Sequence, residues 1–259
     1  MANKPILAPI FRVVIPARYA STRLPGKPLR IIAGRTLLEH VFERAMASGA
    51  DEVQIATDDQ RVVEACARFG ARVAMTSDAH ASGTDRIAEV AAREAWEEND
   101  IVVNVQGDEP LLPPTLVRQV AELLEAQPTA GVATLATPIE SLADFLDPNV
   151  VKVAVGRTGL ALYFSRAPIP WPRDGAAQGL ASQSQVGGAL RHLGLYAYRV
   201  GVLKRLTAMP PSALEQTEKL EQLRALDNGI AIAVGLARVR PGPGVDTEDD
   251  LAAVARLLG

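Results

Sequence analysis

Residues 15–29 read Ile15-Pro16-Ala17-Arg18-Tyr19-Ala20-Ser21-Thr22-Arg23-Leu24-Pro25-Gly26-Lys27-Pro28-Leu29. The short apolar run that precedes them, residues 11–15, is typical of a buried strand in a parallel sheet. Residues 36–45 follow, with apolar positions at helical spacing behind Thr36 as a cap. An open α/β sheet binds its ligands in such a loop, at the carboxyl end of a strand. The sequence therefore predicts an α/β fold with a ligand-binding loop at residues 15–29.

This loop carries three cations, Arg18, Arg23 and Lys27. Like charges so close together repel one another unless an anion lies between them, and a polyphosphate is a fitting partner for guanidinium and ammonium groups. A solvated basic loop explains the charges equally well. A P-loop is excluded, because Ser21 stands at its first glycine position and Pro28 at its hydroxyl position.

Composition and net charge favour some classes of protein and argue against others. The chain has 259 residues, of which 48% are hydrophobic and 4% aromatic, and a net charge of −3. This length suits a large α/β core, and the charge argues against a general nucleic-acid or membrane-surface binder. The single cysteine, Cys66, cannot form an internal disulfide, so we expect a cytoplasmic protein. The N-terminal residues predict no signal peptide, and no run approaches membrane-spanning length.

Strand and helix patterns alternate along the first half of the chain. Strands are predicted at residues 53–57, 71–75, 101–105 and 131–137, and helices at 60–69, 87–96 and 114–126. This alternation predicts a doubly wound, mostly parallel, Rossmann-like sheet. We expect residues 1–137 and 230–259 to form the core, and residues 138–229 to form a smaller region of strands and helices.

The smaller region has a looser pattern. Residues 150–155 and 160–165 predict a hairpin, residues 191–199 a strand, and residues 214–227 a single helix. Residues 175–189 are rich in Gly, Ala, Ser and Gln, and predict a mobile surface loop that could serve as a lid. Residues 230–239 predict one or two final strands, and residues 251–258 the last helix.

A second informative loop precedes the helix at residues 87–96. Ser82 and Asp85 have the spacing of a capping box, which accounts for both without any ligand. Arg86, in the first helical turn, is unfavourable for the helix dipole. A phosphate bound at this helix start would explain its placement.

Two acidic residues predict a magnesium site. Asp108 follows the most apolar strand, at the edge where the ligand must lie, and would face the polyphosphate unless a divalent cation lay between them. Mg²⁺ binds through one or two carboxylates plus substrate phosphates. Thr247 and Asp250 can cap the last helix, which leaves Asp246 free to supply the second carboxylate. Taken alone, residues 108–110 also fit an ordinary turn.

Two further features have ordinary structural explanations when taken alone. Glu218, Glu221 and Gln222 share one face of the predicted helix, as a solvated helix face would. His192 lies in an alternating strand, where a lone histidine is more often structural than functional.

Taken together, these segments resemble the sugar-acid cytidylyltransferases, most closely those that use 3-deoxy-manno-octulosonate (Kdo). The matching stretches run in family order along nearly the whole chain: residues 15–29, 56–58, 82–86, 103–110, 163–172, 191–198, 220–224 and 244–251. The first loop and the run Val-Asn-Val-Gln-Gly-Asp-Glu-Pro at residues 103–110 are specific to this family. Glu248 stands where we expect a proline, which changes the helix start and leaves Asp246 in place.

The resemblance implies a nucleotidyltransferase fold and a homodimeric, Mg²⁺-dependent enzyme of lipopolysaccharide biosynthesis. Such an enzyme couples CTP to Kdo and releases pyrophosphate. By the same resemblance, Arg18 and Lys27 hold the triphosphate, Ser82 and Arg86 lie on the nucleotide side, and Asp108 and Asp246 bind the metal; the first two and the last two are the expected catalytic residues. The residues expected around the sugar acid are Arg23, Gln106, Arg166, Arg173, His192, Tyr196, Glu221 and Gln222.

Two alternatives remain at this stage. The substrate could be another acidic sugar, such as a sialic acid or an amino analogue of Kdo. The chain could also be a non-catalytic nucleotide-binding module that has kept the fold, although Lys27, Asp108 and Asp246 are all present.

Overall fold

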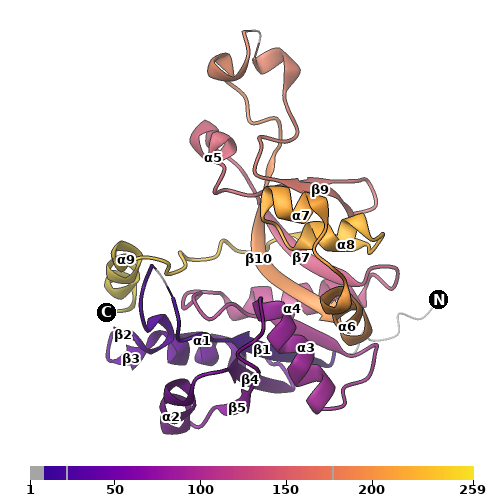
Figure 1. Ribbon diagram of the computed structural model, residues 1–259. Helices are drawn as coiled ribbons and strands as arrows, with labels where there is room; N and C mark the ends of the chain where they lie inside the picture. The colour runs from indigo at the N-terminus through magenta and orange to yellow at the C-terminus, as the bar shows by residue number, and fades with distance from the viewer. Residues whose placement is uncertain (1–8, 22, 177) are drawn as a thin grey trace, which may run out of the picture.

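The structure is a computed structural model that describes residues 9–21, 23–176 and 178–259 (Figure 1). A central sheet runs through the described residues in the strand order β11-β7-β10-β6-β1-β4-β5. These strands are β1 (Phe11–Pro16), β4 (Glu52–Thr57), β5 (Arg72–Met75), β6 (Ile101–Asn104), β7 (Val132–Pro138), β10 (Leu190–Arg199) and β11 (Ile232–Leu236). The sheet continues from β10 through β8 (Lys152–Val155) and β9 (Ala161–Ser165).

The predicted mostly parallel sheet is confirmed. β1 pairs in parallel with β4 and β6, β4 with β5, and β7 with β11. β10 is antiparallel to both of its main neighbours, β6 and β7. An alternating pattern marks a strand without fixing its direction, so the sequence did not indicate this insertion. β10 belongs to residues 138–229, and it lies inside the core sheet.

Helices cover both faces of the sheet, because neighbouring strand residues point to opposite sides. Val13 and Ile15 pack in one apolar cluster with α1 (Leu37–Met46), α2 (Gln60–Arg68) and α4 (Pro114–Glu125). Val14 packs on the other face with α3 (Gly83–Arg93), α6 (Val200–Ala208) and α8 (Gln222–Asp227). Burial on both faces explains why the strands read as continuous apolar runs.

The last helix, α9 (Glu248–Leu258), returns to the first loop (Figure 1). It packs beside the small hairpin of β2 (Ile31–Ile32) and β3 (Arg35–Thr36). Leu24, Ile32, Leu37, Val245 and Val254 form the apolar cluster between them. The predicted capping box of Thr247 and Asp250 is present at the start of α9. This packing carries Asp246 to the residue 15–29 loop.

The predicted helix over residues 214–227 is wrong as a single element. The chain forms α7 (Ala213–Glu218) and α8, separated at Lys219, which has a φ of 53°. The Glu218 carboxylate accepts hydrogen bonds from the Ser165 hydroxyl at 2.6 Å and from the Arg166 amide at 2.9 Å. These contacts anchor the end of α7 to the end of β9. α6 and the short α5 (Leu142–Leu146) were not predicted.

Residues 166–176 and 178–189 extend away from the sheet as an arm (Figure 1). The arm contains two short 3-10 helices, η2 (Arg173–Gly175) and η3 (Leu180–Ser182), and the Ser184 amide donates to the Gly175 carbonyl at 3.0 Å. Whether residues 175–189 act as a lid stays a prediction. Among the described residues, no helix has both the length and the apolar character needed to span a membrane.

Candidate active site

Lys27 joins the two carboxylates that the sequence singled out. Its Nζ lies 2.6 Å from Asp108 Oδ2 and 2.9 Å from Asp246 Oδ1. Arg23 adds a second cation, with its Nη2 atom 3.1 Å from Asp246 Oδ1. Lys27 opens the 3-10 helix η1 (Lys27–Leu29), which follows Gly26 at a φ of 65°. One charged cluster is therefore formed by Arg23, Lys27, Asp108 and Asp246.

Adjacent strands bring these residues together. Val14 of β1 lies opposite Asn104 of β6 in a parallel pair, so the loops that follow the two strands start side by side. Gly107 permits their close approach, because a Cβ there would lie 3.0 Å from the Pro16 carbonyl oxygen. The Val245 amide donates to the Asp108 carbonyl at 2.8 Å. This bond holds the C-terminal segment against the Asp108 turn.

Charged neighbours and burial shift the pKa values of the groups in and beside this cluster. Burial alone would lower the pKa of Lys27, but the carboxylates of Asp108 and Asp246 outweigh it and raise the pKa above 10.5. Burial raises the pKa of the neighbouring Glu109 to about 7, and Asp108 adds to this, with Arg191 opposing the shift. Lys27 is therefore held as a cation, and Glu109 is an acid poised near neutral pH.

A cavity of about 430 Å³ adjoins this cluster. Its walls come from the ends of three segments: the turn after β6, the β7–β10 pair, and the chain leading to α9. The lining includes Gln106, Glu109, Arg191, His192 and Arg240. Two of the residues expected around a sugar acid, Gln106 and His192, thus line one cavity next to Asp108.

His192 and Tyr196 lie together on β10. Their ring centroids are 5.2 Å apart, and Phe164 meets His192 edge-on at 5.0 Å. The imidazole Nε2 is 3.0 Å from the Thr134 hydroxyl. Burial lowers the pKa of His192 to about 3, so its imidazole is neutral at physiological pH. A neutral ring can orient a substrate by hydrogen bonding.

Glu221 and Gln222 lie at the start of α8, against the other face of the sheet. Burial raises the pKa of Glu221, with the Thr84 side chain and Arg224 opposing the shift. Gln222 is 8% exposed, and its side-chain Nε2 is buried without a hydrogen-bond partner among the described residues. Asn104 is 2% exposed, and its side-chain oxygen is likewise unpaired. Unpaired buried amides are costly, which makes them candidates for binding a polar ligand.

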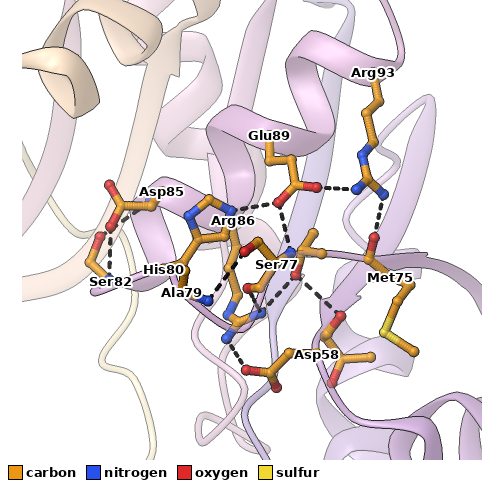
Figure 2. A network of polar contacts seen from close by, with 12 residues as sticks. Asp58, Met75, Ser77, Ala79, His80, Ser82, Asp85, Arg86, Glu89 and Arg93 are labelled. Carbon is orange, nitrogen blue, oxygen red and sulfur yellow. Dashed lines mark hydrogen bonds and ion pairs between the residues drawn. The ribbon is translucent and has the colours of Figure 1, made fainter.

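Arg86 does not lie where a phosphate could reach it freely. It is fully buried, donates to the Thr76 hydroxyl at 2.7 Å and forms an ion pair with Asp58 (Figure 2). Asp58 balances the charge of Arg86, so its placement needs no bound phosphate, and a role of Arg86 on the nucleotide side stays a prediction. Ser82 caps α3 through the predicted box with Asp85. Arg18 donates to the carbonyl of His80, in the loop before Ser82.

Two expected sugar-acid residues stand apart from the cluster. The Arg166 guanidinium donates from Nε to the Glu218 carbonyl at 2.7 Å and from Nη1 to the Pro148 carbonyl at 3.0 Å. It therefore braces the base of the arm. Arg173 is exposed on η2, within the arm. One copy of the chain does not bring Arg173 to the cavity.

Sequence reasoning missed Glu109 and Arg191 as lining residues. Glu109 directly follows Asp108 in the same acidic turn, and that adjacency was the available signal. Arg191 precedes His192 at the start of β10, where a lone arginine gives no pattern. Thr84, within the capping turn of α3, had no signal beyond its place next to Gly83.

Comparison with known proteins gives matches along most of the chain. A model of the cytidylyltransferase family matches residues 12–232. The chain is 56% identical to a 3-deoxy-manno-octulosonate cytidylyltransferase of Thioalkalivibrio sulfidiphilus, over 96% of this chain and 98% of the relative. It is 54% identical to the protein of that name from Pseudomonas syringae pv. syringae, with coverage of 96% and 98%.

Solved structures give the same picture. A CMP:2-keto-3-deoxy-manno-octonic acid synthetase complexed with CTP superposes with a TM-score of 0.86 at 44% identity, covering 96% of this chain and 98% of that one. A 4-diphosphocytidyl-2C-methyl-D-erythritol synthase superposes with a TM-score of 0.64 at 15% identity, covering 98% and 100%, which shows a shared fold alone.

Proposed function

This chain belongs to the 3-deoxy-manno-octulosonate cytidylyltransferase family of nucleotidyltransferases, and we propose that it transfers the cytidylyl group of CTP to Kdo. The anomeric hydroxyl of the sugar acid attacks the α-phosphorus of CTP. The bond from that phosphorus to the bridging oxygen breaks, and the products are CMP-Kdo and pyrophosphate. The observation that carries this proposal is the convergence of Lys27 with Asp108 and Asp246 beside a cavity.

The cations of the first loop bind the triphosphate in this proposal. Arg18 and Lys27 follow β1 at the edge of the sheet where ligands bind. Their positive charges stabilise the negative charge that develops on the leaving pyrophosphate. Such a transfer needs little covalent chemistry from the protein, because positioning and charge stabilisation supply most of the acceleration.

Asp108 and Asp246 fit a magnesium site. They already converge on one cation, and their side chains are 34% and 48% exposed, which leaves room for further ligands. Among the described residues, no cluster of three or more His, Cys, Asp or Glu side chains could enclose a metal ion alone. Two carboxylates completed by substrate phosphates suit Mg²⁺. When bound, the ion would neutralise phosphate charge and lower the pKa of the attacking hydroxyl.

The sugar acid occupies the cavity in this proposal. Arg191 and Arg23 offer positive charge for its carboxylate, and Gln106 and neutral His192 offer hydrogen bonds to its hydroxyls. Tyr196 packs against His192 and keeps the ring in place. The buried side-chain amides of Gln222 and Asn104 have atoms without a hydrogen-bond partner among the described residues, and these are further candidates for contact with a polar ligand.

We further propose a cytoplasmic homodimer. The single cysteine, Cys66, is buried and unpaired, which suits a reducing compartment. The arm of residues 166–176 and 178–189 offers surface for a second copy, with Trp171 40% and Leu180 59% exposed. Light scattering coupled to gel filtration measures the oligomeric state, and a monomer at micromolar concentration would contradict the dimer.

Pyrophosphate release tests the proposed reaction. The purified chain is incubated with Mg²⁺, CTP and one sugar acid from a panel that includes Kdo, its amino analogue and a sialic acid. Rapid release with Kdo, abolished by EDTA and restored by excess Mg²⁺, is expected. Faster release with another sugar acid would reassign the substrate. CTP binding without release for any sugar acid would favour the non-catalytic nucleotide-binding module.

A further inference from the structure

The loop at residues 76–82 folds back on α3 and is fastened at both ends. At its start, the Thr76 amide donates to the Thr57 carbonyl at 2.8 Å, and Arg86 donates to the Ser77 carbonyl at 3.2 Å. At its end, Ser82 caps α3. Residues 78–81 lie between these anchors and need their own support.

Glu89 of α3 supplies that support (Figure 2). Its Oε2 atom accepts from the Ser77 amide at 2.9 Å and lies 2.5 Å from His80 Nε2. The Glu89 and His80 side chains are 18% and 23% exposed. Burial alone would raise the pKa of Glu89, but the Ser77 amide, His80 and Arg93 outweigh it and lower the pKa. Glu89 is therefore a carboxylate that contacts the loop twice, at the Ser77 backbone amide and at the His80 imidazole.

His80 connects this support to the first loop. Its imidazole turns toward Glu89 on α3, while its backbone carbonyl accepts from the Arg18 guanidinium. Arg18 thus depends on the position of residue 80, and residue 80 depends on Glu89. Neither His80 nor Glu89 belongs to the charged cluster around Lys27.

We propose that His80 and Glu89 are a positioning pair that fixes Arg18 for the triphosphate of CTP. The inference rests on the proposed function, which places Arg18 at the triphosphate. A preorganised arginine binds its anion without paying for the ordering of its loop. Without the pair, part of the free energy of CTP binding is lost to the ordering of residues 78–81. The loss then falls on CTP affinity and spares the rate once CTP is bound.

Three variants test the pair. His80→Ala removes the imidazole, and Glu89→Ala removes the bonds to both His80 and Ser77. His80→Gln keeps a side-chain N–H donor near the position of Nε2. Glu94→Ala is the matched control, because Glu94 lies at the end of the same helix and pairs with Arg72, away from the loop.

The readouts are the Kd for CTP by calorimetry without sugar acid, and KM and kcat with Kdo. His80→Ala is expected to raise Kd and KM for CTP about tenfold with kcat within about twofold, as loss of a charge-assisted hydrogen bond implies. Glu89→Ala is expected to exceed this, and His80→Gln to restore most of the affinity. Glu94→Ala is expected to match the wild type.

The outcomes separate this inference from the proposed function. A lowered Tm with unchanged Kd and KM in both alanine variants would make the pair merely structural and overturn the inference, while wild-type turnover would still support the function. Wild-type CTP binding without turnover would overturn the function, and the Kd series would still decide the inference. A wild type that does not bind CTP would overturn both.

Discussion

The Lys27 ammonium lies 2.6 Å from the Asp108 carboxylate, although 81 positions of sequence separate the two residues. The contact joins the loop after β1 to the turn after β6, and Asp246 meets the same ammonium from the segment before α9. A cation and two acids from three distant segments therefore share one place at the edge of the sheet. This arrangement is what the proposed phosphoryl chemistry requires.

Asp108→Ala and Asp246→Ala should each lower kcat at least about a thousandfold, because each removes a carboxylate from the proposed metal site. CTP binding should survive in part, since Arg18 and Lys27 remain. Pyrophosphate release measures the first effect, and calorimetry with CTP the second. Asp249→Ala is the control, because Asp249 is exposed in the first turn of α9. Turnover like that of the wild type in either variant would remove the metal site from the account.

Lys27→Met should lower the free energy of unfolding and raise KM for CTP. It leaves Asp108 and Asp246 facing each other without their shared cation, and we expect a loss of about 1 kcal/mol in the free energy of unfolding, since these carboxylates are partly solvated. KM for CTP should rise because a triphosphate ligand is lost. Urea unfolding and steady-state kinetics measure the two effects. Unchanged KM in a folded variant would place Lys27 outside the triphosphate site.

His192→Gln should reduce the amount by which the free energy of unfolding falls as the pH is lowered from 7.5 to 5. The folded-state pKa of His192, about 3, lies below its ordinary 6.5. The unfolded chain therefore takes up the proton first, and stability is lost as the pH falls below about 6.5. This group accounts for about 2 kcal/mol of the loss between pH 7.5 and 5. Urea titrations at both pH values check it, and equal losses in wild type and variant would contradict a neutral imidazole at this half-buried position.

Gly107→Ala should lower kcat about tenfold or more while the protein stays folded. The new Cβ would lie 3.0 Å from the Pro16 carbonyl oxygen, so the Asp108 turn would be pushed from the end of β1. Gly156→Ala is the control, because a Cβ there first meets the exposed side chain of Leu162 at 3.3 Å, which can move aside. Equal turnover in the two variants would show that the turn tolerates displacement.

Local sequence was enough to predict the elements that place the site. Residues 11–15 and 101–105 have the continuous apolar pattern of buried strands because helices cover both faces of these strands. The end of the second strand then fixes where Asp108 lies, at the edge of the sheet. The caps at Thr36, Ser82 and Thr247 were visible because each is a contact between residues three apart.

The rest depends on contacts distant in sequence. Residues 214–227 have no glycine or proline, yet the helix breaks at Lys219, next to Glu218, whose carboxylate bonds to the end of β9. Asp58, the ion-pair partner of Arg86, lies 28 positions earlier, so the sequence did not indicate that the charge of Arg86 is balanced within the protein. The partners of Arg166, the carbonyls of Glu218 and Pro148, are also distant in sequence. No periodicity or spacing reveals such partners.

The central claim is that Asp108 and Asp246 jointly bind a divalent ion with CTP. Electron paramagnetic resonance of Mn²⁺, added as a probe together with CTP, measures bound ion directly. We predict tight Mn²⁺ binding in the wild type and in Asp249→Ala, and its loss in the Asp108→Ala/Asp246→Ala double variant. Mn²⁺ binding of equal affinity in the double variant would contradict the claim.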